Sequence, residues 1–195
     1  MVDKNEVVAF FDSLAPTWDA EMIISDLIVK TILDNAGVRK GSTVLDVACG
    51  TGVLIPFYFD RKVSSVTGID ISPAMIEIAR SKFPASPVEF ICADAETWKS
   101  GRQFDGIVIY NAFPHFSDPE LLFENLSSML AGGGILTVAH GMSREKINAH
   151  HFGSAMHVSN GLPLAEDLAE LMGRYLEVRT IFSDSNMYQV CGVKK

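Results

Sequence analysis

Val44-Leu45-Asp46-Val47-Ala48-Cys49-Gly50-Thr51-Gly52 is the stretch that decides the fold of this chain. Its apolar residues predict a short buried strand, its glycines predict a sharp turn, and a helix is expected from Val53. Because glycine has no Cβ, Gly50 and Gly52 would let the backbone turn tightly and approach a ligand closely. The start of the following helix would offer unpaired N–H groups. The stretch therefore predicts the strand–turn–helix of a nucleotide-type cofactor site.

Acidic residues stand at the ends of the next two apolar runs. Asp70 follows Gly50 by 20 residues, which is the spacing at which a carboxylate on a second strand meets a ribose placed over the first turn. Its charge-assisted hydrogen bonds to ribose hydroxyls would each contribute about 1.5–3 kcal/mol. Asp94 is placed to accept a hydrogen bond from an adenine amino group. A glycine-rich turn alone could be an ordinary tight connection, but the two aspartates in register favour a cofactor site.

The middle of the chain alternates apolar runs with helical patterns. Ser72-Pro73 and Asp118-Pro119 each place a capping side chain before a proline at the first helical position. Uninterrupted apolar runs are typical of strands buried on both faces, so the alternation predicts an α/β protein with a doubly wound, mostly parallel sheet. Strands are expected near Thr43–Val47, Val63–Ile69, Val88–Cys92, Asp105–Tyr110 and Gly134–Ala139.

The two ends of the chain depart from this alternation. Helical spacing predicts two helices within residues 1–40, and a further helix is expected over Leu164–Tyr175. After it, Leu176–Ser183 and Met187–Val193 are separated by a turn-like segment and predict an antiparallel hairpin added to the sheet, giving seven strands. We expect residues 1–195 to form a single domain.

Composition excludes several classes of partner. The formal net charge is −8 and the sequence pI is about 5.0, so the long-range field would repel nucleic acid and anionic membranes. No apolar run approaches the ~20 residues of a membrane span, and the polar N-terminus predicts no secretory leader. Cys49, Cys92 and Cys191 are far apart, which predicts reduced thiols and a cytoplasmic protein. The sequence leaves a homodimer open.

These motifs, in this order, resemble those of class I S-adenosylmethionine-dependent methyltransferases. Phe11–Asp19 further resembles the N-terminal segment of the subgroup that includes ubiquinone and menaquinone C-methyltransferases. Ala48 stands where many members have glycine, and Ser127-Ser128-Met129 stands where an arginine-rich helix end is common. The segments that carry the resemblance are Val44–Gly52, Asp70, Asp94-Ala95, Tyr110–Pro119, Leu130–Leu136 and the terminal hairpin.

The resemblance implies a Rossmann-like methyltransferase fold with S-adenosylmethionine as cofactor. We expect Asp46 to shape the turn by holding its N–H groups, Asn111 to line the methionine portion, and Trp18 either to cover the pocket or to pin the N-terminal helices. Ile71 and Met75 would pack around ribose and adenine or belong to the core. The candidate cofactor-binding residues are Trp18, Asp46, Ala48, Gly50, Gly52, Asp70, Ile71, Met75, Asp94, Ala95 and Asn111.

Methyl transfer from a sulfonium is an in-line displacement that needs a positioned nucleophile and exclusion of water. A general base is required only if the acceptor is protonated. All five histidines lie in the second half of the chain, and we expect His115 or His151 to act as base or substrate hydrogen-bond partner. The alternative is that they are wall or surface residues. Residues 1–40 would form a lid, and residues 141–163 a substrate-side cover.

Other readings remain open at this point. An NAD-dependent oxidoreductase would use Gly50, Gly52 and Asp70, but Ile55 stands in place of its third glycine. A non-catalytic protein that binds S-adenosylmethionine is a second alternative. His150 and His157 could share one helix face and bind zinc together with His140 or His115, yet no compact His-x-x-x-His or Cys-x-x-Cys pair exists, so no metal is expected. The acceptor is expected to be a small molecule.

Overall fold

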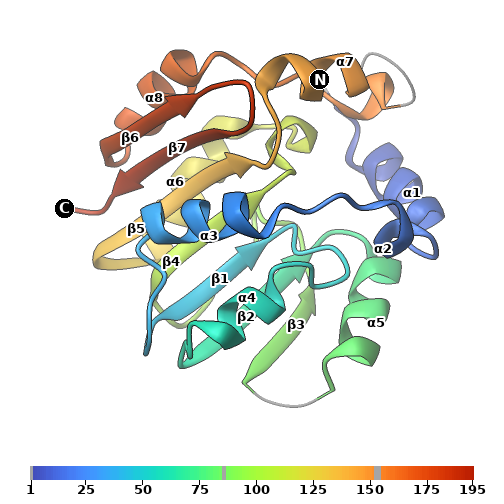
Figure 1. Cartoon of the computed structure of the whole chain (residues 1–195), viewed down its shortest axis with the longest axis horizontal. Helices are drawn as coiled ribbons and strands as arrows, with labels where there is room; N and C mark the ends of the chain where they lie inside the picture. The colour runs from blue at the N-terminus through green and yellow to red at the C-terminus, as the bar shows by residue number, and fades with distance from the viewer. Residues whose placement is uncertain (1, 85–86, 152–154) are drawn as a thin grey trace.

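The computed structural model describes residues 2–84, 87–151 and 155–195, without the side chain of His151. A seven-stranded sheet runs through the molecule in the order β3-β2-β1-β4-β5-β7-β6 (Figure 1). The strands are β1 Thr43–Val47, β2 Ser65–Asp70, β3 Val88–Cys92, β4 Phe104–Tyr110, β5 Leu130–His140, β6 Glu177–Ser183 and β7 Tyr188–Val193. Strands β1 to β5 pair in parallel, and β7 is antiparallel to both β5 and β6. The predicted sheet and its terminal hairpin are confirmed.

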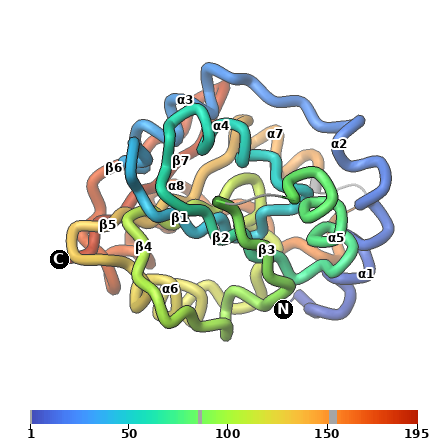
Figure 2. Tube along the Cα trace, turned by 90° about the horizontal axis from the view of Figure 1, so that it is seen from below, coloured from blue at the N-terminus to red at the C-terminus, as the bar shows by residue number. Residues whose placement is uncertain are grey.

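Helices cover both faces of this sheet. Apolar residues of α3, α4 and α5 pack on one face, and those of α6 and α8 pack on the other, so the sheet lies between two cores. Figure 2 shows α3 and α4 on one side of the strands and α6 on the opposite side. The helices are α1 Lys4–Leu14, α2 Trp18–Glu21, α3 Asp26–Asn35, α4 Ile55–Asp60, α5 Pro73–Lys82, α6 Pro119–Met129, α7 Arg144–His151 and α8 Ala165–Gly173. Two short 3-10 helices, η1 Phe113–His115 and η2 Met156–Val158, complete the described elements.

Local chemistry sets several helix ends as expected. The Ser72 hydroxyl accepts a hydrogen bond from the Met75 N–H at 3.1 Å, and Asp118 caps α6 in the same way. The helix after the glycine turn begins at Ile55 instead of Val53. Residues between the turn and Ile55 are held by short-range hydrogen bonds, and Gly52 at φ +86° cannot continue a helix.

A third, smaller apolar cluster joins the N-terminal helix to the segment that precedes α8. Its buried members are Val2, Val7, Ala155 and Val158, and Ile71 packs against it from the end of β2. Residues 2–14 and 155–158, far apart in sequence, therefore share one core above the sheet edge. No helix within the described ranges is both long enough and apolar enough to cross a membrane.

Candidate functional site

The strand order reverses between β1 and β4, which is where open α/β sheets bind ligands. Each of these strands is followed by a non-glycine residue in the left-handed region: Ala48 at φ 54° and Asn111 at φ 55°. The Asn111 side-chain oxygen accepts a hydrogen bond from the Gly141 N–H at 2.9 Å, which ties the ends of β4 and β5 together. Such strained residues persist where the surroundings impose them, often at binding sites.

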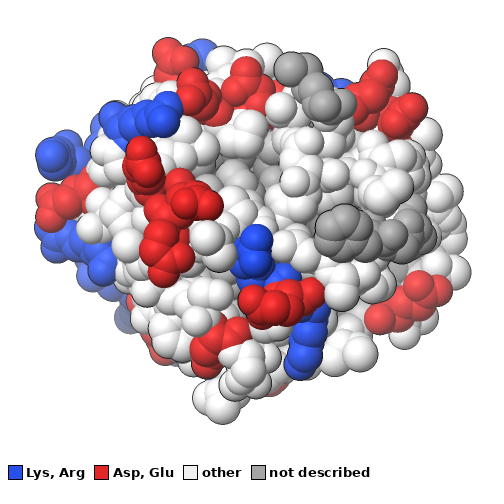
Figure 3. Space-filling model, turned by 90° about the horizontal axis from the view of Figure 1, so that it is seen from above, with Lys and Arg blue, Asp and Glu red and all other residues white. Residues whose placement is uncertain are grey.

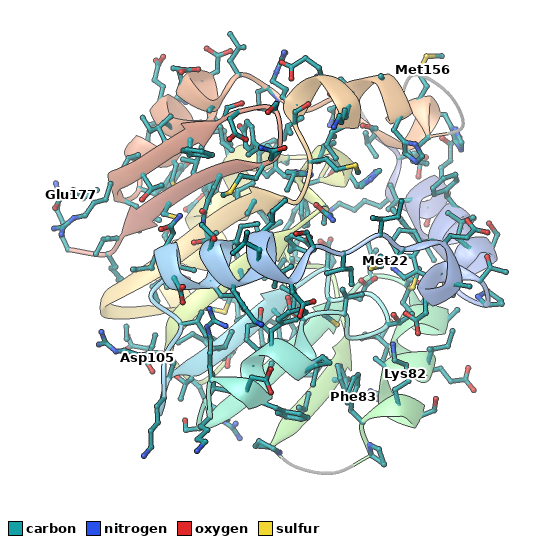
Figure 4. All side chains as sticks on the ribbon, in the orientation of Figure 1. Met22, Lys82, Phe83, Asp105, Met156 and Glu177 are labelled. Atoms are coloured by element: carbon teal, nitrogen blue, oxygen red, sulfur yellow. The ribbon has the colours of Figure 1, made fainter. Side chains whose placement is uncertain are left out.

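The two glycines of the turn serve different purposes. Gly50 has φ +54°, and a Cβ added there would meet only the Trp18 indole nitrogen at 3.7 Å. At Gly52 a Cβ would come within 2.8 Å of the Phe83 ring at the end of α5 (Figure 4). Packing against α5 occupies the space beside Gly52, whereas among the described residues the Gly50 side of the turn meets only Trp18. Contact of either glycine with a cofactor stays a prediction.

Asp70 is a buried carboxylate that bonds to the turn. Its two oxygens accept hydrogen bonds from the Gly50 N–H at 2.8 Å and from the Ser72 N–H at 2.9 Å. Burial raises the pKa of Asp70 to about 6, although these hydrogen bonds act against the rise. A carboxylate has about four acceptor sites, so two N–H donors leave capacity for ribose hydroxyls.

Asp46 differs from its expected role. The turn N–H groups of Cys49 and Gly50 bond to the Ile69 carbonyl and to Asp70, so Asp46 does not hold the turn. Asp46 is 2 % exposed, and its Oδ2 atom is buried without a hydrogen-bond partner. Burial, reinforced by the nearby Asp70 charge, raises its pKa to about 8. The buried Tyr58 hydroxyl lies against Asp46, and a hydrogen bond from it acts against the rise in the Asp46 pKa. A buried carboxylate of this kind also suits a cationic donor supplied by a ligand.

Asp94 lies just past β3, beside a residue that the sequence reasoning missed. Lys4 of α1 reaches over the sheet edge and pairs with Asp94 at 2.6 Å and with Glu96 at 2.5 Å. Glu96 is 2 % exposed and also accepts hydrogen bonds from the Ser117 and Asp118 N–H groups at 2.6 and 2.9 Å. One carboxylate thus joins the turn after β3, the loop after β4 and the N-terminal helix.

The remaining predicted cofactor residues surround the same edge. Trp18 packs edge-on against Phe11 with ring centroids 5.8 Å apart, and it stands over the glycine turn. Ile71 packs into the small cluster under α1, whereas Met75 and Ala95 are buried. Their contact with a cofactor stays a prediction.

His115 is the histidine that the structure places beside this edge. Its Nδ1 atom lies 2.7 Å from the Val158 carbonyl, and the Phe11 ring packs edge-on against it at 4.9 Å. Burial lowers the pKa of His115, so the ring is neutral at pH 7, and the bond to Val158 makes Nδ1 the protonated nitrogen. The lone pair is then on Nε2.

The other histidines are dispersed. The side chain of His151 lies outside the described residues, so its predicted role stays a prediction. His140 is buried at the end of β5 against Tyr188, with ring centroids 5.9 Å apart, and His157 lies 5.7 Å from Phe10 on the cover. Among the described residues no three histidine, cysteine or acidic side chains are grouped to hold a metal ion.

Comparison with known proteins agrees with this geometry. Residues 44–134, which span the glycine turn and both aspartates, match the family described as a methyltransferase domain. This match places a methyltransferase domain over residues 44–134 of the chain. Over 139 residues the chain is 34% identical to a malonyl-[acyl-carrier protein] O-methyltransferase of Acetivibrio thermocellus, covering 70% of this chain and 49% of that protein. It is also 27% identical over 161 residues to a ubiquinone/menaquinone biosynthesis C-methyltransferase of Campylobacter jejuni, covering 75% of this chain and 68% of that protein.

The methyltransferase domain has the same fold in solved structures. The chain aligns with DhpI in complex with S-adenosylhomocysteine at a TM-score of 0.73 and 20% identity, over 98% of this chain and 97% of that one. The chain spans about half the length of the first curated relatives that it matches. These comparisons relate the chain to methyltransferases, and they do not decide the subgroup or the methyl acceptor.

S-adenosylmethionine is the cofactor of this domain, and the residues at the sheet edge fit it. Its α-ammonium group would satisfy the orphaned Asp46 oxygen, and its ribose would take the free acceptor sites of Asp70. A side chain at position 50 would reach into the space beside the turn. Among the described residues beyond its two chain neighbours, only Trp18 lies within 4 Å of the place that its Cβ would take. An NAD-dependent oxidoreductase finds no comparable support.

Proposed function

We propose that this chain transfers the methyl group of S-adenosylmethionine to a small-molecule acceptor by in-line displacement. The observation that carries the proposal is the neutral, half-buried His115, fixed beside the end of β4 where the strand order reverses. When bound, the cofactor supplies a methyl group on a positively charged sulfur. The chain must orient the acceptor, exclude water and, where the acceptor is protonated, receive its proton.

His115 is suited to receive that proton. The Val158 carbonyl accepts the Nδ1–H hydrogen bond, which fixes the ring orientation and makes Nε2 the unprotonated nitrogen of the neutral ring. Because burial lowers the pKa of His115, the base form persists below neutral pH. Activity that needs this base would therefore hold at pH 7 and fall only in more acidic solution.

We further propose that the N-terminal helices close the site as a lid, together with residues 155–163. Three charged side chains of this lid each contact one segment of the cofactor site. Lys4 pairs with Asp94, and the Asp12 carboxylate accepts the Ser72 hydroxyl hydrogen at 2.5 Å. Asp19 bonds to the Thr51 hydroxyl at 2.5 Å and pairs with Lys82 at 2.6 Å (Figure 4).

Limited proteolysis tests the lid. Saturating S-adenosylhomocysteine is expected to slow cleavage within residues 1–25, and Lys4→Met should restore much of the cleavage. Lys30→Met is the matched control because Lys30 forms an exposed ion pair with Asp26 of its own helix at 3.7 Å, away from the cofactor site. Equal cleavage with and without the ligand would contradict the lid.

The relatives suggest which acceptors to assay. Their names include a malonyl-acyl-carrier protein methyltransferase and a quinone-biosynthesis methyltransferase, so free acids, acyl carrier thioesters and phenolic rings form the panel. We expect labelled methyl to be transferred from S-adenosylmethionine to at least one acceptor. The rate of this transfer should fall at least tenfold in His115→Ala and should not fall in His157→Ala. His157 is exposed on the same cover, which makes it the control.

Two results would contradict the proposal in different ways. Binding of the cofactor without transfer to any member of the panel would favour a non-catalytic binding protein. Unchanged turnover in His115→Ala would remove this histidine from the mechanism and leave methyl transfer in place. A cytoplasmic location and a homodimer remain predictions.

A further inference from the structure

A hollow of about 380 Å³ lies on the cover, between α7 and the segment that leads to α8. It is lined by Arg144 and Asn148 of α7, by Met156 and by residues 159–163. We propose that this hollow binds the carboxylate of the methyl acceptor as a recognition handle, which makes the acceptor a small organic acid. The inference rests on the proposed function and names its substrate class.

The Arg144 side chain is anchored before any ligand arrives. Its Nε–H donates to the Leu162 carbonyl at 3.0 Å. The Asn148 amide holds the same residue, because its oxygen accepts from the Leu162 N–H at 2.7 Å and its nitrogen donates to the Leu162 carbonyl at 3.1 Å. With Nε fixed, the orientation of the guanidinium plane is restricted and its terminal nitrogens form a fork for a planar carboxylate. Less side-chain entropy is then lost on binding.

Charge in the hollow favours an anion. Among the described residues that line it there is no acidic side chain, and Arg144 forms no ion pair within the described ranges. This local cation stands out in a chain whose net charge is −8. A single arginine balances the single charge of a carboxylate, whereas a phosphate dianion would remain half unneutralised.

The hollow adjoins the segment that carries His115. The Val158 carbonyl meets His115, and Asn160 bonds to the Pro114 carbonyl at 2.8 Å and to the Phe116 carbonyl at 2.9 Å. A molecule held by Arg144 would therefore lie against the loop that positions the proposed base.

A second hollow suggests the rest of the acceptor. It measures about 330 Å³ and shares Asn160, Gly161 and Pro163 with the first, and its lining includes Phe113, Phe116, Leu168 and Leu171, with Asp167 as its one charged residue. Figure 3 looks down on this face of the molecule, where uncharged side chains cover the areas between separate groups of charged ones. An aromatic or aliphatic body joined to a carboxylate fits this pairing.

The test uses the whole chain saturated with S-adenosylhomocysteine and titrates 4-phenylbutyrate, with the neutral 4-phenylbutyramide as the matched ligand. We expect the acid to bind at least tenfold more tightly than the amide. Arg144→Gln should weaken the acid about tenfold without changing the amide, and Arg144→Lys should fall between because it keeps the charge and loses the fork. Arg174→Gln is the control, since Arg174 is exposed and paired with Glu120.

Several results would overturn the inference. One is equal binding of the acid and the amide, and another is no binding of the acid at about 10 mM. The others are tighter binding of inorganic phosphate than of the acid at Arg144, or an unchanged affinity for the acid in both Arg144 variants. Affinity for S-adenosylhomocysteine is measured on every variant and is expected to stay unchanged. A failure here with methyl transfer intact would reject the acid handle alone, whereas failure of transfer to every acceptor would reject the proposed function.

Discussion

Replacement of Asp46 by Asn should make the ligand-free protein more stable, and the gain should depend on pH. Asp46 is 2 % exposed with an unpartnered oxygen, and its pKa in the folded chain is about 8 against an ordinary value of 3.8. At pH 7 the unfolded chain ionises this group and the folded chain keeps it protonated. The stability that the neutral carboxyl contributes is therefore complete below about pH 4 and declines as the pH rises toward 8.

The size of the effect follows from these two pKa values. Between pH 5 and pH 7 the site is ionised in the unfolded chain and protonated in the folded chain. The unfolding free energy of the parent protein therefore falls by about 1.36 kcal/mol per pH unit, or about 2–3 kcal/mol over this range. Asn has no such titration. The difference in unfolding free energy between Asp46→Asn and the parent protein should grow by about that amount over this pH range.

Urea unfolding of both proteins, without ligand, measures the stability difference between variant and parent at pH 5 and again at pH 7. Any packing cost of the amide is the same at both pH values and cancels in this comparison. Asp26→Asn, at an exposed position of α3, is the control and should show no such growth. The same Asp46→Asn protein should bind S-adenosylmethionine more weakly, because an amide, unlike the carboxyl group, cannot ionise to pair with the ammonium group of the cofactor. A gain that is equal at both pH values would refute the reasoning from burial.

Three further substitutions probe the site by other means. Gly52→Ala should lower the unfolding free energy by about 2–3 kcal/mol, since φ +86° and the Phe83 ring at 2.8 Å both oppose a Cβ; unchanged denaturant midpoints would contradict this. Ala48→Gly should be neutral or stabilise by up to about 1 kcal/mol, because Ala48 is left-handed at φ 54°, and a clear loss in thermal unfolding would show that its methyl group matters more. Glu96→Ala should cost about 1–3 kcal/mol by leaving partly buried N–H groups of the loop after β4 without their acceptor, and it should also speed proteolysis of residues 1–25 in the ligand complex. Loss of stability alone would separate Glu96 from the lid.

Patterns that act locally could be predicted from the sequence. The strand bounds of β1 and β3, the caps at Ser72 and Asp118, and the antiparallel hairpin are set by apolar runs, capping side chains and turn residues within a few positions of each other. Asp70 was placed correctly beside the glycine turn, because two adjacent parallel strands in this fold bring a position 20 residues later to the same edge.

Contacts between distant segments could not be predicted in this way. The pairing of Lys4 with Asp94 and Glu96 spans about half of the chain, and no periodicity encodes it. The surroundings of Asp46 were missed because a carboxylate next to a glycine turn usually finds an N–H donor. Here Asp70 takes the Gly50 donor, and Asp46 lies against the buried Tyr58 hydroxyl. Gly52 was assigned to ligand approach because its neighbour Phe83 lies on another helix.

The small cluster of Val2, Val7, Ala155 and Val158 is separate from the two cores that hold the sheet. A few buried side chains stabilise far less than a whole core, so this part of the molecule should open at a free energy well below that of global unfolding. Amide hydrogens of α1 would then exchange with solvent long before those of β1 and β4. On warming, the chain would lose its closed N-terminal region, and with it tight retention of the cofactor, while the sheet is still folded.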